Sequence, residues 1–219
     1  MNPLVIAIDG PSGSGKSSTA RLVAKRLHLA YLDTGAMYRA IAVGCMAGGL
    51  LDDPDGIVGF AQRASLVMGT DPDSPTVVLN GVDVTQDARQ PEVSASVSKV
   101  ATIQTVRDIL TAQMRQIVQQ LGRIVVEGRD ITTVVCPDAS VRVLLIADPT
   151  ARMQRRNAQV GGGLTPTQLR DQVVRRDRDD ATVSRFEMPA PGVTLIDSTH
   201  LTLDEVVDAV VSLVPGELQ

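Results

Sequence analysis

The sequence contains few aromatic residues and few cysteines. It has no Trp and only two Tyr and two Phe in 219 residues, so a broad aromatic platform for stacking nucleic-acid bases is not expected. The two cysteines, Cys45 and Cys136, lie far apart and lack a C-x-x-C partner or paired histidines. This spacing indicates neither a disulfide framework nor a zinc site, and we expect both residues to be core thiols.

Long apolar runs are also missing. The longest, such as 141–147, are too short and too interrupted to span a membrane. The N-terminus has no basic region followed by a cleavable apolar stretch, so we expect a cytoplasmic protein without a signal peptide. A hydrophobic content of 43% is typical of a soluble globular protein, and the length favours one domain with appendages.

An excess of positive charge is absent as well. The net charge of −4 argues against a general nucleic-acid binder. The basic residues are nevertheless unusual in kind, because 18 are Arg and only 3 are Lys. Arginine suits bidentate recognition of phosphate and carboxylate, but a GC-rich genome also raises the arginine count. We therefore interpret only those arginines that occupy motif positions.

One glycine-rich stretch organises the chain. It follows the apolar run 4–8, precedes a helical pattern and matches G-x-x-x-x-G-K-[ST] in full. Its glycines and the following helix N-terminus predict a cage for nucleotide phosphates, with Lys16 at the outer phosphates and Ser17 as a Mg²⁺ ligand. The alternative is a plain strand-to-helix turn. The predicted phosphate-binding residues are Gly10, Pro11, Ser12, Gly13, Ser14, Gly15, Lys16, Ser17 and Ser18.

Five continuous apolar runs, separated by helical patterns, predict an α/β fold with a five-stranded parallel sheet flanked by helices. Each run is followed by an acidic residue, and the carboxyl ends of parallel strands meet in one crevice. We therefore expect the acids and the phosphate loop to gather at one edge of the sheet. The runs are 4–8, 30–32, 124–126, 141–147 and 193–196, and the acids are Asp9, Asp33, Glu127, Asp148 and Asp197.

An antiparallel segment interrupts this α/β pattern. Asn80-Gly81 between two β-prone runs is a strong signal for a type I′ hairpin. We interpret 61–98 as an insertion that forms a small subdomain over the crevice, with a core of 1–60, 99–150 and 190–219. Helices are expected at 16–27, at 35–48 with Thr34 as N-cap, and at 57–68, 106–121, 150–160, 165–180 and 202–213.

The composition of the region 151–189 is typical of a lid that closes over a site. Two helical patterns rich in arginine are joined by Gly161, Gly162 and Gly163, as a lid over phosphates would require. A solvated, arginine-rich helix pair is the alternative.

Four further motifs select the reaction. They are Asp33-Thr34-Gly35-Ala36-Met37-Tyr38-Arg39, Ser98-Lys99-Val100-Ala101 with Arg107, Glu127-Gly128-Arg129-Asp130 continuing to Val135, and Arg176-Asp177 followed by Asp179-Asp180. With the phosphate loop, they make the chain resemble the bacterial cytidylate kinases, P-loop nucleoside monophosphate kinases, from Leu4 to beyond Thr199. The resemblance implies transfer of the γ-phosphoryl group of ATP to CMP or dCMP, giving ADP and CDP or dCDP.

The resemblance also implies that the insertion 61–98 binds CMP, and it implies roles for individual residues. Cytosine carries an amino donor that uracil lacks, so a cytosine pocket needs a fixed acceptor, which Asp130 can supply. The base would contact Ser98, Arg107 and Asp130, the acceptor phosphate Thr34, Arg39 and Arg129, and the ribose Arg176 and Asp180. Lys16, Arg129, Arg155 and Arg156 would stabilise charge on the moving phosphoryl group.

The sequence departs from the family pattern at two positions. The family commonly reads R-D-x-x-D-x-x-R, but here the last position is Val183 and the next arginine is Arg185. Arg185 is the candidate third phosphate ligand, with a surface charge as the alternative. Glu127 stands where the family has Asp, which retains the charge on a longer side chain.

Two other functions remain open from the sequence. One is a kinase of the same fold for UMP, AMP or a metabolite. The other is a GTP- or ATP-dependent switch, although the N-K-x-D motif of guanine recognition is missing. We expect ATP, Mg²⁺ and a nucleoside monophosphate as small-molecule partners of a monomer, with no nucleic acid and no membrane.

Overall fold

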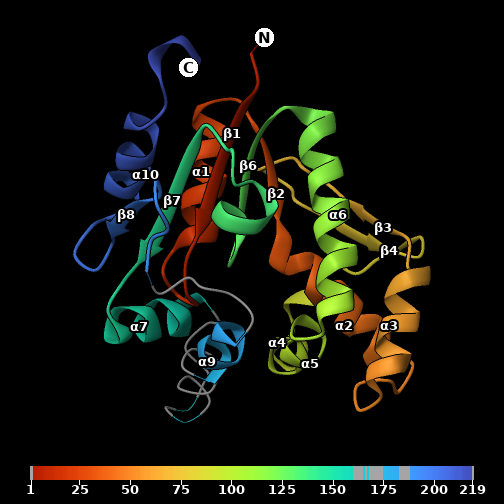
Figure 1. Cartoon of the computed structure of the whole chain (residues 1–219). Coiled ribbons are helices and arrows are strands. Elements are labelled where there is room, and N and C mark those ends of the chain that lie inside the picture. The colour runs from red at the N-terminus through yellow and green to blue at the C-terminus, as the bar shows by residue number, and fades with distance from the viewer. Residues whose placement is uncertain (1, 160–164, 166, 168–174, 183–187, 219) are drawn as a thin grey trace.

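The computed structural model describes residues 2–159, 165, 167, 175–182 and 188–218 (Figure 1). The side chains of 159, 176 and 180 are outside the description. No helix in these ranges is both long enough and apolar enough to cross a membrane.

A five-stranded parallel sheet forms the centre of the molecule, as predicted. Its order is β2-β6-β1-β7-β8, and neighbouring strands pair in parallel register. The three central strands are buried on both faces, which explains why their sequences are continuously apolar. The strands are β1 (Leu4–Asp9), β2 (Ala30–Asp33), β6 (Arg123–Gly128), β7 (Val141–Ile146) and β8 (Thr194–Asp197).

Helices cover the two faces of the sheet. Ile6 and Ile8 of β1 pack with Val23 of α1 (Lys16–Arg26) and Val207 of α10 (Leu203–Ser212). Ala7 points to the other face, where its cluster includes residues of α2 (Thr34–Ala47) and α6 (Gln104–Leu121). The alternation along β1 therefore divides the core into two layers.

Two expected helix boundaries are wrong. Asp33, not Thr34, is the N-cap of α2, because its side chain accepts a hydrogen bond from the Ala36 N–H at 2.8 Å. The helix expected at 57–68 is α3 (Pro54–Arg63), and Leu66–Met68 forms β3 instead. Pairing with β4 (Val77–Leu79) overrides the helical periodicity of that short segment.

The hairpin signal at Asn80-Gly81 is confirmed. Asn80 and Gly81 have φ values of 50° and 83°, which a type I′ turn requires. The turn joins β4 to β5 (Val82–Asp83), and β3, β4 and β5 form a separate antiparallel sheet. The segment continues through η1 (Asp87–Arg89), α4 (Pro91–Ser96) and α5 (Ser98–Ala101).

Most of the elements after α5 belong to the central sheet or to the helices that cover it. Helix α6 ends at Gly122, which adopts a left-handed φ of 66° as the C-cap. A π-helical turn, η2 (Ile131–Val135), follows β6, and α7 (Pro149–Gln159) follows β7. Of the helix expected at 165–180, the described part is mainly α9 (Arg176–Ala181). Figure 1 shows α4, α7 and α9 at one end of the sheet and both termini at the other; η4 (Gly216–Leu218) is the last element.

Candidate active site

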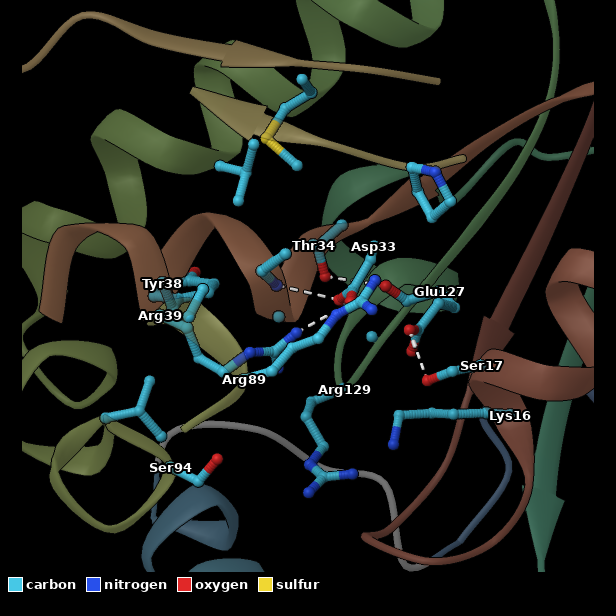
Figure 2. Close-up of a pocket in the computed structure, with 18 of the residues that line it drawn as sticks. Lys16, Ser17, Asp33, Thr34, Tyr38, Arg39, Arg89, Ser94, Glu127 and Arg129 are labelled. Carbon is cyan, nitrogen blue, oxygen red and sulfur yellow. Dashed lines mark hydrogen bonds and ion pairs between the residues drawn. The ribbon is translucent and has the colours of Figure 1, made fainter. Parts of the chain in front are cut away.

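A cavity of about 450 Å³ opens at the carboxyl end of the sheet. Its walls come from the phosphate loop, the start of α2, the segment 68–101 and the residues after β6. In Figure 2, Arg39 and Arg89 enter the cavity from one side, and Lys16 and Ser17 enter from the opposite side. Two of the five predicted acids, Asp33 and Glu127, therefore line the same cavity as the phosphate loop, whereas the other three are not among its described lining residues.

The phosphate loop adopts a tight turn before α1. Gly13 and Gly15 have φ values of 77° and 93°, which glycine adopts without steric cost. A Cβ at Gly10 would overlap the Leu145 carbonyl, so the loop lies directly against β7. The Lys16 ammonium donates to the Pro11 carbonyl at 3.3 Å, across the mouth of the loop.

Glu127 at the end of β6 links the loop to the neighbouring strand. The Ser17 hydroxyl donates to its Oε1 at 2.7 Å, and the Tyr31 hydroxyl donates to the same oxygen at 3.3 Å. Burial raises the pKa of Glu127, and the nearby Asp33 carboxylate raises it further, whereas Lys16 opposes the rise. The longer Glu side chain thus still reaches the predicted metal ligand Ser17.

Asp33 and Arg39 form an ion pair at the start of α2. The Arg39 Nη2 lies 2.8 Å from the Asp33 Oδ2. Burial favours a higher pKa for Asp33, but Arg39 and the Ala36 N–H outweigh it and lower the pKa. The Thr34 hydroxyl donates to the Glu127 carbonyl at 2.8 Å, which ties α2 to β6. Thr34 and Arg39 both line the cavity.

Arg107 and Asp130 meet in the wall of the cavity. They form a buried ion pair, in which Arg107 is 8% exposed and Asp130 is 9% exposed. The Arg107 Nη1 also donates to the Ala101 carbonyl at 3.1 Å. Burying two charges is costly unless they are paired and hydrogen-bonded, so this pair holds a fixed orientation at the cavity wall.

The expected contact at Ser98 is not evident in the cavity. Among the described residues, the lining of this wall includes Ser94, Val97 and Ala101 but not Ser98. The Ser98 carbonyl accepts hydrogen bonds from Thr102 within the chain turn that ends α5. The contact of Ser98 with the base therefore remains a prediction.

Arg129 reaches from the end of β6 to the phosphate loop. Its Nη1 donates to the Gly10 carbonyl, and its Nη2 lies 3.1 Å from the Asp177 Oδ1. Figure 2 shows Arg129 and Lys16 projecting into the same part of the cavity. Arg129 is therefore placed between the loop and α9.

The predicted arginines of α7, Arg155 and Arg156, lie close to the phosphate loop. Arg155 Nη1 donates to the Ser198 hydroxyl at 2.9 Å, and its Nη2 donates to the Ser198 carbonyl at 2.6 Å. Arg156 lines the main cavity and a second one of about 310 Å³. Burial lowers the pKa of Arg156, and the positive charge of Arg39 lowers it further.

The second cavity lies between the loop and α10. It is lined by Gly13–Thr19 and by Arg155, Arg156 and Ser198, with an apolar wall of Leu201, Leu203 and Val206. The sequence analysis assigned no site role to this wall. It also missed three other residues: Arg89 and Ser94, which line the main cavity, and Arg152, which contacts the phosphate loop. The only signal for them was their place within the insertion and the arginine-rich helix.

Three predicted site residues remain untested by the geometry. Arg185 lies outside the described residues, and so do the side chains of Arg176 and Asp180, although the backbone of α9 is described.

Comparisons with known proteins agree on one family. A family model described as cytidylate kinase matches residues 6–216. The chain is 59% identical to the cytidylate kinase of Cutibacterium acnes, covering 100% of this chain and 99% of that protein. It is 42% identical to the cytidylate kinase of Streptomyces griseus, over 98% and 94%. An uncharacterized protein from Eubacterium ventriosum shares the fold, with a TM-score of 0.52 and 11% identity over 95% and 96% of the two chains.

Proposed function

The chain belongs to the cytidylate kinase family, and we propose that it transfers the γ-phosphoryl group of ATP to CMP or dCMP, giving ADP and CDP or dCDP. One observation carries the proposal. Lys16, Arg39 and Asp130 line a single cavity, although they are far apart in the sequence. A phosphate loop, an acceptor-phosphate arginine and a base-selecting carboxylate can therefore act on two nucleotides in one place.

The base would bind at the Arg107–Asp130 pair. The Asp130 carboxylate is an acceptor for the cytosine amino group, and Arg107 can donate to the ring's acceptor atoms. Against uracil, the same carboxylate would face a carbonyl oxygen, which costs several kcal/mol in a buried site. Polar complementarity at this pair, within a wall that also includes Ser94, Val97 and Ala101, would dominate the choice of base.

The acceptor phosphate would bind between the base and the phosphate loop. Arg39, Arg129 and the Thr34 hydroxyl, as the family's matching residues, would neutralise and position it. Arg89 faces the same space in Figure 2 and adds a fourth candidate. Bringing two negative groups together requires this density of cations, because each phosphate repels the other.

ATP would bind with its phosphates in the loop and its base in the second cavity. The loop amides and Lys16 would hold the β- and γ-phosphates. The apolar wall of Leu201, Leu203 and Val206 suits an adenine ring, and Arg155 and Arg156 lie beside it. The two cavities share Lys16, Ser17 and Arg156, so the transferred group would pass between them in line.

The chemistry of the donor set fits Mg²⁺. The Ser17 hydroxyl and the carboxylates of Asp33 and Glu127 line one wall of the cavity, and hard oxygen ligands with bound phosphates are what Mg²⁺ prefers. Among the described residues there is no group of three or more His, Cys, Asp or Glu able to hold a metal alone. The ion would therefore arrive with the nucleotide, where it neutralises phosphate charge.

We further propose that 61–98 forms the acceptor-side subdomain and 151–189 the lid of a monomeric enzyme. Closing both over bound nucleotides would exclude water and prevent simple ATP hydrolysis.

A panel of acceptors tests the function. Purified protein is supplied with ATP, Mg²⁺ and CMP, dCMP, UMP or AMP, and ADP formation is measured with and without acceptor. We expect CMP or dCMP to give the highest kcat/KM, and hydrolysis without acceptor to be far slower. Equal or better turnover of UMP would contradict the cytosine assignment. Slow, acceptor-independent hydrolysis as the only activity would instead indicate a nucleotide switch.

A further inference from the structure

A single carboxylate connects α9 to the phosphate loop. The Asp177 Oδ1 accepts a hydrogen bond from the Ser12 N–H at 2.9 Å and lies 3.1 Å from the Arg129 Nη2. Its Oδ2 pairs with the Arg152 Nη1. Asp177 thus contacts the loop, the end of β6 and α7 at the same time, although 165 residues separate it from Ser12.

The two arginines around this carboxylate are also bound to the loop. Arg129 donates to the Gly10 carbonyl, and Arg152 donates to the Ser12 carbonyl at 3.2 Å. Each guanidinium therefore has one partner on the loop backbone and one on Asp177. Two partners fix the direction of a planar, forked donor far better than one does.

The local charges favour this partner. The side chains of Arg129, Arg152 and Asp177 are only 13%, 12% and 14% exposed. Lys16 and Arg156 line the same cavity as Arg129, so Asp177 offsets part of the positive charge that gathers there. A largely buried arginine that loses its carboxylate also retains an uncompensated charge.

We propose that Asp177 is a positioning residue for the phosphoryl transfer: its carboxylate holds Arg129 and Arg152 against the phosphate loop. The inference rests on the proposed function and extends it to an acid that the reaction itself does not use. A carboxylate repels phosphate, so Asp177 acts through the two arginines and not as a substrate ligand. Arg129, which lies beside Lys16 in the cavity, is the arginine through which it affects the transferred group.

Asp177→Asn tests the proposal, because it removes the charge and keeps the shape. We expect kcat for CMP to fall about 10- to 100-fold, since a small misplacement of a catalytic group costs on that order. Binding of cytosine, which has neither ribose nor phosphate, is expected to stay within about twofold, because the base site at Arg107 and Asp130 is untouched. A simple folding defect would weaken cytosine binding as well.

Asp208→Asn is the control for the loss of one carboxylate. Asp208 lies on α10 and pairs with Arg26 at an exposed position, so its substitution removes the same charge without touching the loop contacts. We expect its kcat to stay within about twofold of the parent enzyme.

A double-mutant cycle separates positioning from other effects. If Asp177 acts through Arg129, then Asp177→Asn in an Arg129→Ala background lowers kcat by less than about threefold beyond Arg129→Ala alone. If the losses in kcat from the two substitutions multiply in the double variant, the inference is wrong. It is also wrong if Asp177→Asn alone leaves kcat unchanged. Failure of the proposed function looks different, because the parent enzyme would then not phosphorylate CMP at all.

Discussion

The Asp9 carboxylate at the end of β1 accepts two hydrogen bonds from Thr132: its Oδ2 lies 2.8 Å from the Thr132 N–H and 2.6 Å from the Thr132 hydroxyl. Its Oδ1 accepts a third bond from the Ile131 N–H at 2.8 Å. These bonds clamp η2 to the strand that enters the phosphate loop. Since Asp130 immediately precedes η2, Asp9 links the position of this proposed base-selecting carboxylate to the phosphate loop.

Asp9 gives the protein a distinctive dependence on pH. Burial, only partly offset by the Thr132 hydrogen bonds, raises the pKa of Asp9 from 3.8 to about 6. The folded state therefore holds a proton between about pH 4 and 6 that the unfolded chain has released. Its stabilising contribution is complete below pH 4 and is lost as the pH rises through 6. We expect the loss to be about 3 kcal/mol.

The measurement compares the parent protein with Asp9→Asn by urea unfolding at several pH values between 4 and 7. The difference in free energy of unfolding isolates Asp9, because the other groups titrate equally in both proteins. As the pH rises, the parent protein should lose stability relative to Asp9→Asn. A difference that is constant across the range would show that Asp9 is ionised throughout. Asp9→Asn is also expected to weaken CMP use, because an amide cannot accept hydrogen bonds at both positions.

Asp130→Asn is expected to relax the choice between CMP and UMP. The amide can offer an N–H to the uracil carbonyl, whereas the carboxylate cannot. We expect the ratio of kcat/KM for CMP to that for UMP to fall about 10- to 100-fold. The KM for ATP should remain within about twofold, because Asp130 lines the main cavity and not the second one. If kcat/KM changes equally for CMP and UMP, Asp130 does not contact the base.

Glu127→Gln is expected to raise the Mg²⁺ requirement. The Glu127 carboxylate accepts a hydrogen bond from the Ser17 hydroxyl, and losing its charge weakens both the oxygen donor set and the orientation of Ser17. The half-saturating Mg²⁺ concentration should rise about 10-fold. Activity is titrated with Mg²⁺ at fixed ATP, with Glu217→Gln at an exposed position as the control. An unchanged titration would place the metal elsewhere.

Gly44→Ala tests how α2 packs against the segment that lines the cavity. A Cβ at Gly44 would overlap the ring of Phe60 in α3 and approach Leu79 of β4 at 3.0 Å. Overpacking of this kind costs about 1–3 kcal/mol, more than the helix propensity gained by alanine. Thermal unfolding should show the loss, and Phe60→Leu in the same chain should restore part of it. Equal stability of parent and single variant would mean that the ring can move aside.

The sequence alone determined the parallel sheet, the phosphate loop, the hairpin at Asn80-Gly81 and the end of α6 at Gly122. Each depends on a local rule, either a continuous apolar run, a spaced motif or a backbone angle that glycine adopts readily. The glycine-rich motif also identified Lys16, whereas the family resemblance implied site roles for Arg39, Arg107 and Asp130.

Which of these residues share a cavity, and what holds them there, depends on the tertiary structure. Contacts such as Asp9 with Thr132, or Asp177 with Ser12, join residues more than 120 positions apart, and no periodicity or spacing encodes them. The strand at Leu66–Met68 was missed for the same reason, since it exists only by pairing with β4. Long-range contacts depend on the whole chain folding, so their partners become visible only in three dimensions.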